Sequence, residues 1–444
     1  MKTSLTITTI IVALFVFFGG NVRQHLSGAR EKHDRIQAEA RARSLEAAAE
    51  GNGPTHSQSR AAARAESQKA REAKARETAR KLMGFGNDEG AISFMGRRGD
   101  PDKQLEYQEG LAEAAELDSV GMKVLVGEIA ANGALTDEIR ARLILELGSI
   151  MSMKAPLGAI DLLLDANNRL KIPTDWFQCN IKNSLRTMAI NDPKQAMDWI
   201  QQQAKEHPEL ANINLRGDVV SGIAQTDRGL AFSKLGELGL TKDADTLYRL
   251  GCCAGTPQEC NTVLAAMRHY RTSVGSEEER QFATKNAMAG MGQSVVYAGY
   301  DSVSQWLESA KLSPDEAAGL ASGFNTSVIK KEDAGKWIDW ISGNVPADHL
   351  GAKVDELMKF WTENDYRAAG TWLDSAPAGP AKEAAVRSYA STVASTDPAA
   401  ASQWALTLPA GEERTGLLQN ICTEWRKQDP DTAARFARDH GIGE

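Results

Sequence analysis

The feature that most constrains this chain is an internal repeat of 32 residues in its C-terminal part. The segments that begin at Asp397 and Asp429 carry the same pattern, and the series continues backwards through Asp365 and Asp333 in equal steps. A period of about 20 to 50 residues is typical of proteins built from stacked units, none of which buries its apolar face alone. The repeat therefore predicts an array, and less regular units extend it back to residue 155.

Each unit of the repeat predicts a pair of helices. Asp397 suits the N-cap of a helix, because its carboxylate accepts a backbone N–H bond, and Pro398 suits the first turn. Ala401 and Trp404 follow four and seven residues after the aspartate, on one face of that helix. After a loop that contains Pro and Gly, apolar residues at i, i+3, i+4 and i+7 predict a second helix: Leu418, Ile421, Cys422 and Trp425.

Tryptophan and aspartate recur at fixed positions of the repeat. Seven of the nine tryptophans fall in two slots, which indicates packing between helices, because a binding site made of aromatic rings would need them clustered and exposed. The aspartates are interpreted as N-caps and not as a row of catalytic carboxylates. The structural slots are Trp199, Trp306, Trp340, Trp372 and Trp404 in the first helix, Trp361 and Trp425 in the second, and Asp192, Asp333, Asp365, Asp397 and Asp429 at the caps.

No segment shows the period-2 alternation that predicts a strand. We therefore predict an all-α fold, an α-solenoid of about eight or nine helix–turn–helix repeats of ~32 residues. The units, with their DP-x-x-A-x-x-W start and LP loop, resemble those of uncharacterised bacterial membrane-anchored or exported repeat proteins and, more broadly, the tetratricopeptide and HEAT class of helical hairpins. The tetratricopeptide run W-x-x-L-G-x-x-Y is missing. The resemblance implies a scaffold that binds other proteins, and it brings no catalytic residue.

The N-terminal segment 3–22 contains no charged residue. A helix of about 20 residues just spans a bilayer core of roughly 30 Å. We therefore predict that residues 1–22 are a single-pass transmembrane anchor, with a cleaved signal peptide as the alternative. Basic residues after the segment favour a cytoplasmic body, whereas the short N-terminus resembles an export signal. We place the body outside the cytoplasm, on the periplasmic side, and leave the cytoplasmic side open.

Residues 23–103 are predicted to be a spacer and linker ahead of the repeat domain, 104–444. The spacer is rich in Ala, Arg and Glu, and residues 22–83 have a net charge of +6, against −15 for residues 84–444. This basic arm 23–83 is the basis of an alternative function, binding to a polyanion or to anionic lipid. Nucleic acid is not expected as a partner, because no aromatic residues are interleaved with the basic ones.

The cysteines offer little chemistry. Cys252, Cys253 and Cys260, with His269, match no ordinary zinc spacing, so we expect small packed residues, with a local disulfide from Cys252 or Cys253 to Cys260 as the alternative. The sequence has no G-x-S-x-G, P-loop, H-E-x-x-H or Rossmann glycine pattern. We therefore expect no enzyme, cofactor or metal. An enzyme with a site in the solenoid groove stays a second alternative.

Together these patterns predict a non-catalytic, membrane-anchored scaffold. Its helical repeat surface would bind one or more proteins in the cell envelope. The identity of the partner and the oligomeric state leave no signal in the sequence.

Overall fold

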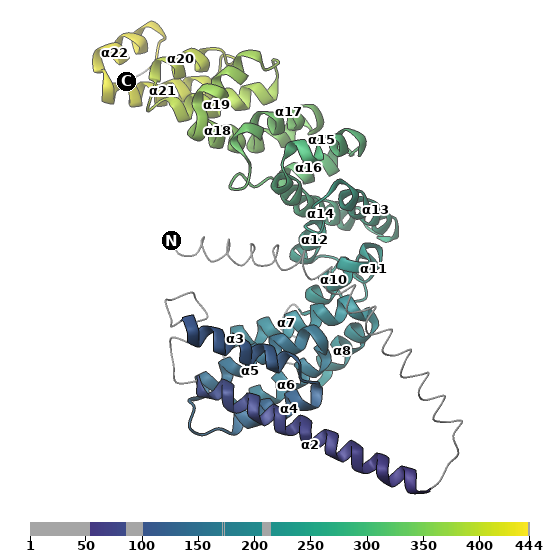
Figure 1. The fold of residues 1–444 in the computed structure, drawn as a ribbon. Coiled ribbons are helices and arrows are strands. Elements are labelled where there is room, and N and C mark those ends of the chain that lie inside the picture. Colours follow the sequence, from purple (N-terminus) through teal and green to yellow (C-terminus); the bar gives the residue numbers. More distant parts are fainter. Residues whose placement is uncertain (1–53, 86–100, 171, 173, 207–214, 443–444) are drawn as a thin grey trace. The chain divides into compact units, whose positions relative to one another are not determined.

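The computed structural model describes residues 54–85, 101–170, 172, 174–206 and 215–442. These residues form twenty α-helices and one 3₁₀ helix, and none of them lies in a strand, which confirms the prediction of an all-α fold (Figure 1). The chain divides into two compact units, 1–77 and 78–444. The predicted anchor 1–22 and the first part of the predicted spacer lie outside the described residues.

The first unit is described from residue 54, where the long helix α2 (Pro54–Gly84) begins. Its sequence carries almost no large apolar residue, so polar pairs one turn apart support it. Glu72 accepts hydrogen bonds from Gln68 and from Arg76, each four residues away. This part of the predicted spacer is therefore a regular helix.

The second unit begins within α2, earlier than the predicted domain boundary at residue 104. Leu82 is fully buried and lies against Gly110 of α3 (Pro101–Ala115), and Phe85 stacks edge-on against Tyr107 at 5.8 Å. Lys81 pairs with Glu113 at 2.9 Å. A composition averaged over the whole arm hides the few apolar residues at its end.

The remaining helices form two rows. Row B consists of helices that pack successively on one another. Row A consists of the helices between them, each packed against one or both of its neighbours in row B. Row B comprises α5 (Asp137–Lys154), α7 (Thr174–Asn191), α10 (Leu215–Thr226), α12 (Ala244–Gly251), α14 (Glu277–Ala298), α16 (Pro314–Ser322), the first part of α18 (Ala347–Ser375), α19 (Pro380–Val393) and α21 (Glu412–Gln428). Row A comprises α4 (Ser119–Ala131), α6 (Pro156–Leu170), α8 (Pro193–Glu206), α11 (Arg228–Ser233), α13 (Pro257–Ser273), α15 (Tyr300–Ser309), α17 (Ala334–Asn344, after the 3₁₀ helix Lys331–Asp333), the last part of α18, α20 (Pro398–Leu406) and α22 (Pro430–Asp439).

The aspartate caps begin the row A helices. Asp397 accepts a hydrogen bond from the backbone N–H of Ala400 at 2.9 Å, and Asp429 accepts one from Thr432 at 3.1 Å. Asp192 and Asp365 make the same bond, each at 3.0 Å. At Asp365 the backbone leaves the helical region (φ −158°, ψ 76°), so this residue separates the two parts of α18.

Asp333 departs from the capping pattern. Its carboxylate makes no capping bond to α17. It accepts hydrogen bonds instead from the backbone N–H of Tyr300 at 3.3 Å and from the Nζ of Lys336 at 3.1 Å. The cap role expected for Asp333 is therefore wrong, because a neighbouring helix competes for the same carboxylate. The run Ser313-Pro314-Asp315-Glu316 has the sequence of a capped helix start, and the capping box between Ser313 and Glu316 is present.

In the C-terminal units, aromatic rings repeat the same contact. Trp361 packs against Trp372 with 6.1 Å between ring centroids, and 64 residues later Trp425 packs against Phe436 at 5.4 Å. The unit between them has Val393 in place of the first ring, and there Tyr389, one turn earlier, reaches Trp404 at 6.2 Å. The 32-residue period thus corresponds to a recurring contact from row B to the next helix of row A.

In the middle of row B the backbones themselves approach. A Cβ added to Gly290 of α14 would overlap the carbonyl oxygen of Tyr248 on α12, and one added to Gly292 would overlap that of Leu320 on α16. Gly323 makes the reciprocal approach to Ala289. Only glycine lets two helices approach this closely, since any side chain would occupy the space of a main-chain atom.

Candidate interaction surface

The tryptophans of the repeat slots hold helices together and do not form one site. Trp199, Trp306, Trp340 and Trp361 are buried, while Trp372, Trp404 and Trp425 are half-buried. Two of them also link successive row A helices, because the indole Nε1 of Trp306 donates to Asn261 and that of Trp372 donates to Asp339, each at 3.0 Å. Trp337, outside the two slots, is fully buried between Tyr300 and Phe324.

Trp176 is the exception, with 42% of its surface exposed. It stands in the first turn of α7 and lines a cleft of about 160 Å³ between α5 and α7. Sequence reasoning did not single out this residue. Its place outside the two periodic slots was the available signal, although Trp337 also lies outside them and is fully buried. The cleft is lined by Arg142, Leu145, Glu146, Ser149, Trp176, Cys179 and Asn180.

Polar bonds fix the walls of this cleft. The hydroxyl of Ser149 on α5 donates to the Oδ1 of Asn180 on α7 at 2.6 Å, and the Nδ2 of Asn180 donates to the carbonyl of Trp176 at 3.1 Å. The side chain of Asn180 thus ties the turn that carries Trp176 to the neighbouring helix.

A buried acid–phenol pair lies at the base of the cleft. The hydroxyl of Tyr107, only 3% exposed, donates to the carboxylate of Glu146. Burial raises the pKa of Glu146 above its usual value, although the bond from Tyr107 and the nearby charge of Arg142 both favour the ionised form. Burial and the charge of Glu146 also raise the pKa of Tyr107. The pair is therefore part of the packed structure.

Two further hollows lie on the same row of helices. One, of about 580 Å³, crosses from α14 over α16 to α18 and includes Phe282, Asp315 and His349. The other, of about 760 Å³, crosses α18, α19 and α21 and is lined mainly by polar side chains. In it, Arg387 reaches across to Glu413 at 3.2 Å, and Ser391 is exposed. The three hollows thus share row B but differ in their linings.

A buried charge cluster joins three successive row B helices. The carboxylate of Asp218 on α10 accepts hydrogen bonds from Arg186 on α7 at 2.6 Å and from Arg249 on α12 at 2.9 Å. The Asp218 side chain is only 4% exposed, so its charge is compensated where water is scarce. Sequence reasoning missed this cluster, yet the spacings of 32 and 31 residues match the repeat.

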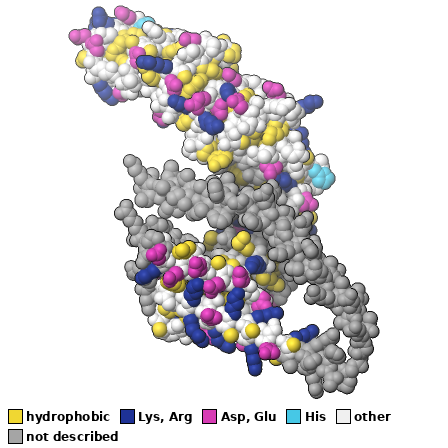
Figure 2. All heavy atoms as spheres, viewed as in Figure 1, with side chains coloured by type: hydrophobic (Ala, Val, Ile, Leu, Met, Phe, Trp, Pro, Cys, Tyr) yellow, Lys and Arg dark blue, Asp and Glu magenta, His cyan; other side chains and the backbone are white. Residues whose placement is uncertain are grey.

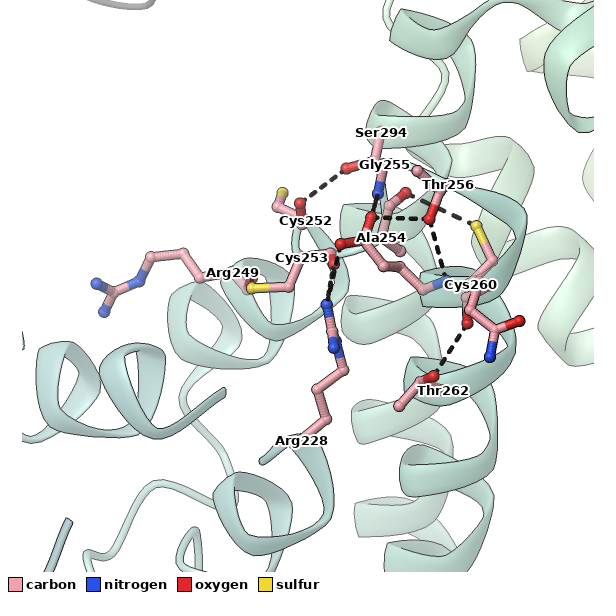
Figure 3. Close-up of polar contacts among 12 residues, drawn as sticks. Arg228, Arg249, Cys252, Cys253, Ala254, Gly255, Thr256, Cys260, Thr262 and Ser294 are labelled. Carbon is pink, nitrogen blue, oxygen red and sulfur yellow. Dashed lines mark hydrogen bonds and ion pairs between the residues drawn. The ribbon is translucent and has the colours of Figure 1, made fainter. Parts of the chain in front are cut away.

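The cysteine segment is a clamped loop (Figure 3). Arg228 of α11 donates to the carbonyl of Cys253 at 2.8 Å, and Ser294 of α14 donates to that of Cys252 at 3.0 Å. The three thiols point in different directions, and all three are free, so the expected alternative of a disulfide is not formed. Desolvation of the sulfur raises the pKa of the Cys252 thiol to about 11, although the residue as a whole is exposed, and it raises the pKa of Cys260 to about 12. Cys252 is exposed, contrary to the expectation that all three are packed.

Two further features are absent from the described residues: a metal site and a membrane-spanning helix. Among the described residues, no group of three or more His, Cys, Asp and Glu side chains could hold a metal ion. Likewise, no helix in the described ranges is both long and apolar enough to cross a membrane, a search that does not include residues 1–53. On the face drawn in Figure 2, basic and acidic side chains are interspersed over the N-terminal helices of the second unit. Comparison with protein-family models, curated proteins and solved structures finds no match for this chain.

Proposed function

We propose that the repeat domain is an α-solenoid and that the chain is a non-catalytic scaffold that binds other proteins along row B. A fourth hollow, of about 510 Å³, lies beside α17, α18 and the start of α19 and includes the row A residues Asp339 and Trp372. The observation that carries this proposal is the position of the other three hollows. Each spans successive row B helices, and their linings change from apolar near α5 to charged near α21. A surface with fixed packing but variable lining is what stacked repeats offer to an extended partner.

The contacts between helices support the solenoid arrangement. The most extensive contacts join helices that are near neighbours in the chain, and row B packs more closely than row A. Closer spacing in one row bends such an array toward that row, so row B would line the inner, concave side. An inner face presents several helices at once to one ligand, and it is where we place the partner.

The N-terminal segment supplies the proposed attachment. Residues 3–22 carry no charge and would span the bilayer, with the body on the periplasmic side, and the helix α2 would act as a spacer. Detection of the N-terminal peptide in the mature, membrane-bound protein would support this attachment. Its loss from the mature protein, with a body that washes off membranes, would leave the signal peptide as the explanation.

Site-specific photo-crosslinking in the full chain tests the binding surface. A benzophenone amino acid replaces Ser391, which lines the hollow across α19, or Gln403, an exposed residue on the row A helix α20. We expect position 391 to crosslink one discrete protein and position 403 to give none. Equal crosslinking from both rows would contradict the proposal, and so would a partner that is lost when only residues 23–77 of the basic arm, which end before the second unit begins, are deleted.

A further inference from the structure

We infer that the cleft beside Trp176 receives one uncharged, apolar side chain of about the size of a benzene ring, carried by a segment of the partner protein. The inference rests on the proposed function and adds the chemistry of the group that the surface recognises. The cleft lies at the N-terminal end of row B, far along the chain from the hollow that contains Ser391.

The size of the cleft sets the size of its occupant. Its volume of about 160 Å³ is close to that of an engineered apolar cavity of ~150 Å³ that binds benzene. One phenylalanine, leucine or methionine side chain fits this space. A whole folded element does not, so the occupant is a single side chain that projects from a larger segment.

The lining selects for an apolar group. Trp176, Leu145 and Cys179 offer apolar and polarisable surface. Two of the polar groups beside them already bond to the protein itself: Ser149 bonds to Asn180 within the cleft, and Glu146 bonds to Tyr107. A polar occupant would therefore lose its bonds to water and find fewer partners here.

The charge of the lining selects for a neutral group. The only charged side chains that line the cleft are Arg142 and Glu146, which have opposite signs. Arg142 also lies 3.9 Å from Glu138 on the same helix. A lysine or an aspartate would therefore gain little attraction and would lose its hydration. Charge complementarity thus favours a side chain without charge.

The surroundings favour a protein segment over a free small molecule. Met153, 65% exposed, follows Ser149 by one turn on α5 and extends the apolar surface beyond the cleft. A segment that places one side chain in the cleft can cover this methionine as well. Exposed tryptophans held in a fixed position are frequent energetic anchors at protein interfaces.

Cys179 provides a direct reporter, because its free thiol lines the cleft, while the exposed Cys252 belongs to a different part of row B. In the full chain, the rate of maleimide labelling at each cysteine is measured by mass spectrometry with capped tripeptides Gly-X-Gly, where X is Phe, Leu, Ala, Lys or Asp. A ligand of this size binds with a Kd on the order of 1 mM.

We expect about 10 mM of the Phe peptide to slow labelling of Cys179 roughly tenfold and to leave Cys252 unchanged. Trp176→Ala should abolish this protection, whereas Tyr297→Ala, which removes another exposed aromatic ring of row B, should preserve it. Circular dichroism and the labelling rate without peptide establish that each variant is folded.

Absence of protection by the Phe and Leu peptides would overturn the inference. Equal protection by the Lys or Asp peptide, or protection that survives Trp176→Ala, would also overturn it. The outcome is separable from that of the proposed function. Crosslinking from position 391 without protection of Cys179 would remove only this inference, while protection of Cys179 with equal crosslinking from both rows would remove only the proposed function.

Discussion

The C-terminal units and the middle units join their helices through different kinds of contact. From residue 333 onward, row B contacts the next row A helix through large rings such as Trp361 with Trp372, and the sequence keeps a period of 32. From residue 215 to 323, helices meet through glycine, as at Gly290 and Gly292, and the period drifts. A contact between two rings fixes the number of residues in a unit, because both rings must recur at the same spacing. A close approach of two backbones needs only a glycine at the point of contact, so the spacing can vary.

The largest effect on stability is expected when a tryptophan of the repeat slots is replaced by alanine. Trp306 is 2% exposed and its indole bonds to Asn261, whereas Trp404 in the same slot is half-buried. Trp306→Ala should cost about 3 to 5 kcal/mol of local stability, as truncation of a buried ring does, and Trp404→Ala roughly half of that. Urea unfolding of both variants checks the ranking. Equal losses would show that burial does not distinguish the two regions.

The next largest effect on stability distinguishes a glycine at which two helix backbones approach closely from a glycine with open space around it. Gly290→Ala should cost about 2 to 3 kcal/mol, because the new methyl group overlaps the carbonyl of Tyr248 and the helices must separate. Gly416 lies in helix α21 with open space around it, so Gly416→Ala should stabilise the protein by roughly 0.5 to 1 kcal/mol. Thermal unfolding of the pair gives opposite signs if the account is right. A stabilised Gly290→Ala would mean that the crossing is not tight.

A smaller effect is expected at the charge cluster of the middle region. Asp218→Asn removes the charge that compensates Arg186 and Arg249. Because both arginine side chains keep contact with water, at 30% and 25% exposure, the loss should be about 2 kcal/mol, less than for a fully buried pair. A double-mutant cycle with Arg186→Met isolates the coupling. If the two substitutions show no coupling energy, the loss of stability comes from packing and not from the ion pair.

The smallest effect is a dependence on pH with opposite signs at two glutamates. Burial alone would raise the pKa of Glu316, but the hydrogen bonds from Arg268 and from the backbone of Ser313 outweigh it and hold the pKa below its usual value. The stability that Glu316 contributes is therefore present above the unfolded value of about 4.5 and is lost as pH falls through the lower folded value. Glu316→Gln should flatten the acid limb of stability against pH.

Glu146 should behave in the opposite way. Its folded pKa is raised, so ionisation opposes folding as pH rises through the unfolded value of about 4.5, and the full penalty is reached above the folded value. Glu146→Gln should therefore increase stability at neutral pH and change it little in acid. Chemical denaturation at several pH values checks both variants. If stability changed with pH in the same way in Glu316→Gln and Glu146→Gln, the causes given for the two pKa shifts would be contradicted.

The sequence predicted the features that local chemistry determines. The all-α fold and the capping box at Glu316 follow from patterns within a few residues. It did not predict the bond from Tyr300 to Asp333, which depends on how a neighbouring helix is placed. It also did not reveal the glycine crossings, because a glycine in a helix carries no periodic signature.

The candidate site was hidden for a related reason. Its lining comes from two helices about 30 residues apart, as in Ser149 and Asn180, and no single motif contains it. Trp176 stands outside the repeat slots, but so does the buried Trp337, so the sequence alone did not single it out. Seven periodic tryptophans predicted how the helices pack, and the one exposed tryptophan lies at the cleft that we propose as a binding site.

Hydrogen exchange of the Trp404→Ala variant tests the central claim, that the body is an array in which each unit depends on its neighbours. Trp404 contacts Tyr389 of the neighbouring helix α19, so the variant should lose protection in α19 to α22. Helices α7 and α8, around Asp192, should exchange as slowly as in the parent protein, because units in a linear array couple only to their neighbours. Loss of protection across both regions together would show one cooperative globular core and would contradict the account.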